Sequence, residues 1–237
     1  MYNNINLKYF NILAGILVVQ LILLSCNSEV SGKKIKQGKI EYKITYLDNV
    51  RQKPLIALLP HKMVTVFKNN STYSVVEGFL FKLVYITNHA NGQNITLFQV
   101  LDKKYMYLAD TSASPFGYQV DKNLQIIHTN KEKTIAGYKC KHAYAVFPDN
   151  KDTLEIYYTD ELGIKDPNCN NPYKKIKGVL MEFTVNMLDI NMNFKAEEVK
   201  KKKIDTNLFK APEGFKLISK KEMEDIFDQY NSIPTEN

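Results

Sequence analysis

The sequence predicts a mainly β domain, a single curved antiparallel sheet with short helical pieces and a C-terminal amphipathic helix. Three observations indicate this class. About ten short segments at regular spacing have the composition of strands, as in domains built on one sheet. Turn residues such as Asn69-Asn70 separate these segments. Helical periodicity occurs only near the two ends of the chain, so helices are expected to flank the sheet rather than alternate with its strands.

The first strand of the sheet is expected at residues 38–47. Ile40, Tyr42, Ile44 and Tyr46 alternate there with charged or polar residues, so one face of the strand is apolar and the other polar. The remaining elements are expected as one or two helical turns at 54–60, a loop at 161–177 and strands at 62–67, 71–87, 94–102, 104–110, 118–121, 124–129, 137–147, 153–160, 178–187 and 190–204.

The C-terminal segment is expected to form an amphipathic helix of about three turns. Ser219 and Glu222 have the spacing of a capping box, in which each side chain accepts a hydrogen bond from the other residue's backbone N–H. Ile218 and Met223 have the spacing of a hydrophobic staple. Apolar residues at helical intervals predict a face that packs on the sheet: Met223, Ile226, Phe227 and Tyr230.

Residues 1–25 are expected to be a signal peptide. As a helix, the apolar run from Phe10 to Leu24 would span about 22 Å, less than the roughly 30 Å core of a bilayer. The sequence that ends at Cys26, Leu-Leu-Ser-Cys, resembles the bacterial lipobox, which makes Cys26 the expected lipidation site. Residues 26–37 then form a lipidated tether, and 38–237 form the β domain. The alternatives are an ordinary signal peptide with a chance cysteine and a single inner-membrane anchor.

The residues after Cys26 bear on the membrane that would receive the lipid. The sequence from Asn27 to Val30 lacks the acidic cluster that resembles a surface-export signal in some bacterial lipoproteins. Asn27 also differs from the Asp that favours retention in the inner membrane. We therefore expect a membrane partner through the N-terminal lipid, with the domain anchored to the outer membrane on its periplasmic face.

Two further cysteines, Cys140 and Cys169, are the candidates for a disulfide. If Cys26 is lipidated, they form an even pair in an oxidising compartment. The alternative is two unpaired, separately buried thiols. Spacing alone does not decide between these alternatives, because a bridge requires the two Cα atoms to lie within about 7 Å.

The charge balance argues against nucleic acid as a partner. The net charge is +7, yet Arg51 is the only arginine. Because planar, bidentate recognition of phosphate depends on arginine, no nucleic-acid partner is expected. The run Lys200–Lys203 suits an exposed strand end or an edge protected from aggregation, and contact with a membrane surface is the alternative.

Short motifs in the C-terminal half resemble a known family. The segment 135–140, IAGYKC, precedes the aromatic segment 157–161, YYTDE, and Gly178 then opens a segment that contains Glu182. The pattern closes with Phe209, Pro212, Gly214 and Phe215. It resembles uncharacterised lipoproteins of the Bacteroidetes type, a domain of unknown function with a LolA/LolB-like fold. The resemblance implies an incomplete antiparallel barrel, a half-barrel with a helical lid and an apolar hollow, which in LolA and LolB holds acyl chains.

The last predicted hairpin is the best candidate for such an apolar surface. Methionine and phenylalanine together form an adaptable surface suited to variable apolar ligands; the alternative is that this face is simply core. Residues 75–86 are apolar on both faces, so a second layer covers them or they line a groove, and Gly78 is a candidate for a bulge. The candidate ligand-binding residues are Val76, Phe79, Phe81, Met181, Phe183, Met187, Met192 and Phe194.

No residue pattern indicates catalysis, a cofactor or a metal. The four histidines, His61, His89, His128 and His142, are scattered along the chain. Only Cys140 and His142 are close, and a zinc site needs two further ligands. The sequence has none of the nucleophile-elbow, zinc-protease or P-loop motifs.

Asp152-Thr153-Leu154 resembles a short bacterial O-glycosylation signal.

The functional expectation is therefore an outer-membrane-anchored periplasmic lipoprotein, not an enzyme. It would bind an apolar ligand, such as lipid or acyl chains, in a half-barrel cavity. The alternative is a structural or interaction lipoprotein of the cell envelope that has a filled core, takes no ligand and docks an envelope protein.

Overall fold

The computed structural model describes residues 34–47, 59–89, 91–110, 116–118, 120–148, 152–187 and 190–231. The chain divides into two compact units, 1–33 and 34–237, and every described residue belongs to the second. The predicted signal peptide and Cys26 therefore lie outside the described residues. No helix among the described residues is long and apolar enough to cross a membrane.

The prediction of a mainly β fold is confirmed. The described strands form one sheet of twelve that does not close, in the order β12-β6-β5-β4-β3-β2-β1-β11-β10-β9-β8-β7. All neighbours are antiparallel except β12 and β6, which are parallel. The strands are β1 (Gln37–Tyr46), β2 (Lys62–Lys68), β3 (Ser71–Glu77), β4 (Phe81–Asn88), β5 (Gln93–Val100), β6 (Lys103–Asp110), β7 (Gln125–Ile135), β8 (Tyr138–Phe147), β9 (Asp152–Thr159), β10 (Val179–Met187), β11 (Ile190–Lys201) and β12 (Lys216–Leu217).

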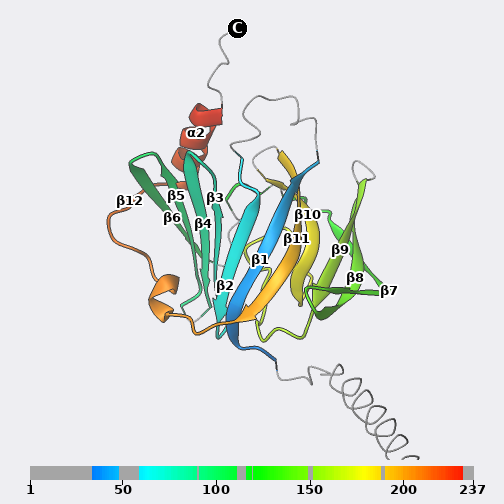
Figure 1. Ribbon diagram of the computed structural model, residues 1–237. Helices are drawn as coiled ribbons and strands as arrows, with labels where there is room; N and C mark the ends of the chain where they lie inside the picture. The colour runs from blue at the N-terminus through cyan, green and yellow to red at the C-terminus, as the bar shows by residue number, and fades with distance from the viewer. Residues whose placement is uncertain are drawn as a thin grey trace, which may run out of the picture. The chain divides into compact units, whose positions relative to one another are not determined.

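Two meanders make up this sheet, and the pairing of β1 with β11 joins them. The first runs through β1 to β6 and the second through β7 to β11. Figure 1 shows the sheet bent near this junction, so that the two meanders lie at an angle to one another. We call the face that carries Ile40, Tyr42 and Ile44 the inner face. These three side chains are at most 4% exposed, which agrees with the alternation predicted for the first strand.

The predicted half-barrel with an apolar hollow is wrong, because the inner face packs into a filled core. Side chains of both meanders belong to one buried cluster, together with residues 162–176, Phe116 and the C-terminal helix. Phe194 is 1% exposed, and its ring stacks on Phe183 with centroids 5.2 Å apart. Apolar residues fill the hollow that an acyl chain would need.

A second, smaller core covers the outer face of β3 to β5. Val84, Ile86, Ile95 and Leu97 are buried there under Ile204 and Phe209, which belong to the segment after β11 that contains the 3-10 helix η3 (Thr206–Phe209). A covering layer therefore explains why residues 75–86 are apolar on both faces. The expected single strand 71–87 is two strands, and Gly78 lies in the connection, where its N–H donates to the Phe81 carbonyl at 2.9 Å.

The C-terminal helix α2 (Lys220–Asn231) is confirmed, together with its capping box. The backbone N–H of Ser219 donates to the Glu222 carboxylate at 2.7 Å, and the N–H of Glu222 donates to the Ser219 hydroxyl at 3.2 Å. Met223 and Phe227 are buried, and the Phe227 ring packs against Phe98 with centroids 5.6 Å apart. The side chain of Tyr230 lies outside the described residues.

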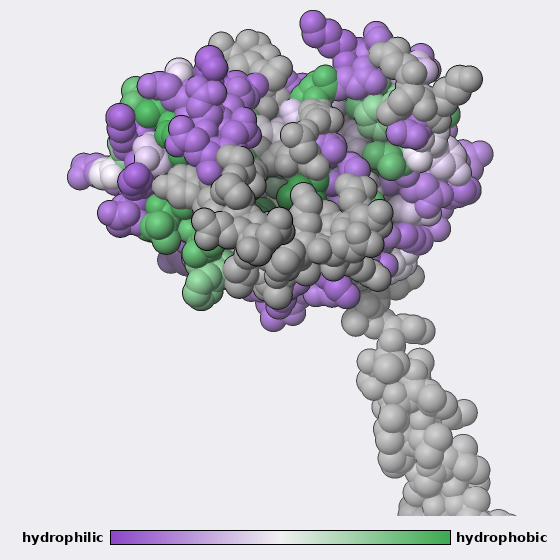
Figure 2. Space-filling model, turned by 90° about the horizontal axis from the view of Figure 1, so that it is seen from above, coloured by the Kyte–Doolittle hydropathy of each residue, from purple (hydrophilic) through white to green (hydrophobic). Residues whose placement is uncertain are grey.

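The structure bears on two other expectations, and a third falls outside the described residues. The predicted strand 118–121 is reduced to a bridge between Tyr118 and Met187, and segment 54–58 lies outside the described residues. Lys200 and Lys201 are exposed and end β11, which agrees with the expected strand end. Because β11 is a central strand paired with β1 and β10, they do not protect an edge. Among the coloured residues of the face seen in Figure 2, hydrophilic ones predominate and hydrophobic ones form separate groups, as expected when apolar residues fill the core.

Candidate polar pocket

Part of the inner face is polar, although it lies against the core. Thr65 of β2, Ser74 of β3 and Tyr85 of β4 stand opposite one another on adjacent strands. Thr72 and Thr87 form a second cross-strand pair. The Thr65 and Ser74 hydroxyls are 2.8 Å apart, and the Thr87 hydroxyl donates to Asn94 Oδ1 at 3.0 Å. Because burying hydroxyl and amide groups costs free energy, such a strip of polar side chains calls for a functional explanation.

Residues 162–178 form a roof over this polar strip. Asn168 is 2% exposed, and its side-chain amide donates to the carbonyls of Ile176 at 2.7 Å and Gly178 at 2.9 Å. Its Oδ1 accepts a hydrogen bond from Asn171 Nδ2 at 3.1 Å. At Gly178, a Cβ atom would lie 2.9 Å from the Thr159 carbonyl oxygen, so only glycine allows the roof to meet β9 this closely. Hydrogen bonds of the Asn168 side chain and close packing therefore hold the roof in place.

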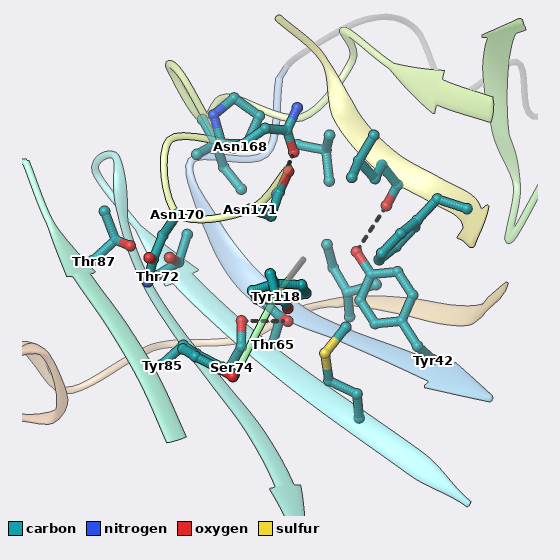
Figure 3. Close-up of a pocket in the computed structure, with 17 residues that line it drawn as sticks. Tyr42, Thr65, Thr72, Ser74, Tyr85, Thr87, Tyr118, Asn168, Asn170 and Asn171 are labelled. Atoms are coloured by element: carbon teal, nitrogen blue, oxygen red, sulfur yellow. Dashed lines mark hydrogen bonds between the residues drawn. The ribbon is translucent and has the colours of Figure 1, made fainter. Parts of the chain in front are cut away.

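Between the polar strip and the roof lies a pocket of about 90 Å³. Figure 3 shows the labelled threonine, serine, tyrosine and asparagine side chains gathered around it. The pocket is lined by Ile40, Tyr42, Met63, Thr65, Thr72, Ser74, Tyr85, Thr87, Tyr118, Ile164, Pro167, Asn168, Asn170, Asn171, Val179, Leu180 and Phe183. Of these described lining residues, none is acidic, basic, histidine or cysteine.

Two buried amide nitrogens at or beside the pocket have no hydrogen-bond partner: Asn170 Nδ2 and Asn94 Nδ2. Asn170 lines the pocket, and Figure 3 shows it beside Thr72 and Thr87. Asn94 is joined to the pocket by its bond to Thr87. Because a buried donor without an acceptor costs about 1–3 kcal/mol, a ligand or water that accepts from Asn170 would be favoured there.

The tyrosines of the pocket remain neutral. Burial raises the pKa of Tyr85 and of Tyr118 well above the usual range. Their rings lie 5.6 Å apart, and the Tyr85 hydroxyl donates to the Phe116 carbonyl at 2.9 Å. The pocket thus combines neutral hydroxyls, amides and aromatic rings. It can accept and donate hydrogen bonds, and among its described lining residues no histidine, lysine or carboxylate lies beside the serine and threonine hydroxyls to activate them.

Most of the candidate ligand-binding residues belong to the main buried core. Six of them are buried side chains that are at most 6% exposed, and of these only Phe183 also lines the pocket: Val76, Met181, Phe183, Met187, Met192 and Phe194. Phe79 lies at the β3–β4 turn and is 80% exposed. Phe81 is partly buried against the core, beside Phe98.

Cys140 and Cys169 are free thiols in the structure, so the alternative of two unpaired cysteines describes them. Each has its own surroundings: the Cys140 thiol donates to the Tyr138 carbonyl at 3.4 Å, and Cys169 Sγ lies 3.7 Å from His89 Nε2. Burial raises the pKa of Cys140 to about 11 and also raises the pKa of Cys169. Both are therefore protonated and poor nucleophiles at neutral pH.

The histidines do not assemble with other ligands. Within the described residues, no group of three or more histidine, cysteine or acidic side chains could hold a metal ion. His142 is fully buried, where its Nδ1 lies 2.8 Å from the Thr129 hydroxyl. His128 Nδ1 lies 2.9 Å from the Tyr158 hydroxyl. These two rings are held by hydroxyl groups within the strands.

The polar pocket was missed because the predicted site followed apolar side chains. One signal was present in the sequence. Thr65 and Thr87 each interrupt a largely apolar strand interior, in β2 and β4, and Thr72 and Ser74 occupy alternate positions in β3. In strands whose two faces are both covered, hydroxyl side chains depart from the apolar pattern that burial favours. Here those hydroxyls lie on the inner face.

One family model matches most of the chain. The family model described as "N-glycanase peptide, N-terminal domain" matches residues 40–222, well over half of the chain. No curated protein sequence is similar enough to count as a match.

Two solved structures of PNGF-II share the fold. The structure in space group P21 has a TM-score of 0.53 at 17% identity and is matched over 81% of this chain and 33% of its own. The structure in space group C2 has a TM-score of 0.50 at 18% identity, over 79% and 32%. The chain thus spans about one third of the length of the structures it matches.

These findings overturn the predicted kinship with lipoproteins of a LolA/LolB-like fold. The motifs that suggested it are strand and turn residues, such as those at 135–140, where Ala136 and Gly137 have positive φ in the β7–β8 turn. Turns and aromatic strands of this kind occur in β-sheets of many different folds, so they do not identify one fold. The predicted function, lipid binding in a LolA-like cavity, is also wrong, because the family match is to N-glycanase N-terminal domains.

Proposed function

Because the chain belongs to the family of N-glycanase N-terminal domains, we propose that it binds carbohydrate chains of glycoproteins in the polar pocket. The observation that carries the proposal is the cross-strand group of hydroxyl and amide side chains beneath the roof, with the unpaired Asn170 amide among them. The matching family is described as the N-terminal domain of an N-glycanase peptide, and PNGF-II shares its fold with this chain. The N-linked glycan is accordingly the ligand class that we assign to this domain.

The chemistry of the pocket supports a neutral, hydroxyl-rich ligand. Sugar hydroxyls and acetamido groups both donate and accept hydrogen bonds, and threonine, serine and asparagine side chains do the same. The paired rings of Tyr85 and Tyr118 add an apolar wall beside these groups. A few placed polar groups within a largely apolar lining are typical of small-ligand sites.

We further propose that the domain is a binding module and not an enzyme. Most glycoside hydrolases use a pair of carboxylic side chains beside the scissile bond. The described lining of the pocket has no carboxylate. With a volume of about 90 Å³, it is also smaller than the 300–1,000 Å³ of typical ligand sites. It therefore suits the end of a glycan, such as one acetamido group, with the rest of the chain outside.

Carbohydrate binding is tested by calorimetry of the full chain in detergent, with N,N′-diacetylchitobiose and with cellobiose, which lacks acetamido groups. We expect chitobiose to bind better, and Asn170→Ala or Thr72→Val to weaken it about five- to tenfold, the value of one hydrogen bond. Thr45→Val, on the exposed outer face of β1, is the matched control and should bind like the wild type. If neither sugar binds, or if Thr72→Val and Thr45→Val bind equally well, the proposal is wrong.

The location of the domain is proposed from the sequence. We propose that Cys26 carries the acyl groups that anchor the chain to the outer membrane on its periplasmic side, because the residues before it resemble a lipobox. Cys26→Ser is expected to move the protein out of the membrane fraction and to remove the acyl mass, measured by fractionation and mass spectrometry. Cys169→Ser should remain in the membrane fraction. A Cys26→Ser protein that stays membrane-bound with unchanged mass would contradict the anchor.

A further inference from the structure

A second cavity lies on the opposite side of the sheet from the polar pocket. It is a groove of about 320 Å³ between the outer face of β3 to β6 and the segment 207–215. The smaller core forms its floor through Val84, Ile86 and Leu97, which are at most 5% exposed. The ring of Tyr73 lines the strand side, and Phe215 lines the side of the covering segment.

The covering segment is fixed on both sides of the groove. Before the groove, the Lys68 ammonium donates to the Ile204 carbonyl at 2.9 Å. After it, β12 pairs with β6, and the N–H of Ile218 donates to the Met106 carbonyl at 2.9 Å. Asn88 Nδ2 also donates to the Phe209 carbonyl at 3.4 Å. The groove is therefore formed before any ligand arrives, which lowers the entropic cost of binding.

Three lysines give this apolar groove a positive rim. Lys82 of β4, Lys104 of β6 and Lys210 of the covering segment all line it, and no acidic residue belongs to its described lining. The Lys104 ammonium lies 5.9 Å from the centre of the Phe215 ring. Of these lysines, Lys82 forms an ion pair with Glu77, whose carboxylate oxygen lies 3.2 Å from the Lys82 ammonium. The summed charge of the rim favours an anion over a neutral molecule.

We propose that this groove binds a small aromatic anion, a carboxylate or sulfonate carried on one or two fused rings. The aliphatic floor and the two aromatic walls take the ring system, and the lysine ammonium groups take the anionic group. The volume falls in the 300–1,000 Å³ range of small-molecule sites. This inference is independent of carbohydrate binding, because the two cavities share no lining residue.

A matched pair of probes, 2-naphthoate and neutral 2-naphthamide, tests the groove by calorimetry on the full chain. We expect naphthoate to bind at least tenfold more tightly than naphthamide, and its affinity to fall as salt is raised. In the triple variant Lys82→Gln, Lys104→Gln and Lys210→Gln, naphthoate binding should fall at least tenfold. Lys103→Gln, beside Lys104 but absent from the lining, is the matched control and should bind like the wild type.

A second variant tests the shape of the groove without changing its charge. Ala211→Phe fills the groove from the covering segment and is expected to abolish naphthoate binding while circular dichroism stays unchanged. The proposal is overturned if naphthoate and naphthamide bind equally well, if Lys103→Gln weakens binding as much as the triple variant, or if neither probe binds at all.

Discussion

Phe194→Ala is expected to lower the free energy of unfolding by about 3–5 kcal/mol. The Phe194 side chain is 1% exposed and stacks on Phe183 at the junction of the two meanders. Removing its ring leaves a cavity that close-packed neighbours fill only in part. Urea unfolding monitored by circular dichroism measures the loss.

Phe79→Ala is the matched control for this prediction. Phe79 is 80% exposed at a turn, so its removal should change stability by less than about 0.5 kcal/mol. This pair also separates a filled core from a ligand cavity. If Phe194→Ala were as mild as Phe79→Ala, the inner face would hold the space that the half-barrel prediction required.

Asn168→Ala is expected to cost about 2–4 kcal/mol, because the carbonyls of Ile176 and Gly178 lose their donor inside the roof. Asn168→Asp tests the donor role more sharply. The carboxylate has nearly the same shape, but an ionised carboxylate only accepts hydrogen bonds. At neutral pH it should therefore be at least as destabilising as alanine. Urea unfolding measures both.

The control for Asn168 is Asn91→Ala, since Asn91 is exposed and, among the residues that the structure describes, its side chain bonds to nearby Gln93. It should change stability by less than about 0.5 kcal/mol. The roof offers a second readout: protease cleavage within residues 162–178 should rise in Asn168→Ala and in Asn168→Asp, but not in Asn91→Ala. Equal stability of Asn168→Asp and the wild type would show that the amide does not hold the roof.

Elements with a strong local pattern could be predicted from the sequence. Strand β1 alternates over its whole length, and α2 begins with a capping box whose two side chains satisfy each other's backbone N–H groups. Both signals depend on neighbours within four residues along the chain. Local physics decides such elements, so they require no knowledge of the rest of the molecule.

The candidate site could not be found in this way, because its parts are far apart in sequence. The polar strip comes from β2 to β4, whereas Asn168 and Asn170 come from the roof about a hundred residues later. In β4, Val84 and Ile86 on one face are as apolar as Leu83 on the other. Alternation therefore did not reveal which face meets the core, or that Tyr85 and Thr87 belong to a pocket.

The sequence by itself determined the mainly β class, the first strand, the capped C-terminal helix and the apolar character of both faces of residues 75–86. Only the tertiary structure decided how the strands pack and which of their faces are buried. The junction of β1 with β11 brings two meanders together and fills the space between them with Phe183, Phe194 and the roof. That packing replaced the expected apolar hollow with a small polar pocket, because burial is decided by which faces meet and not by the hydrophobicity of any one strand.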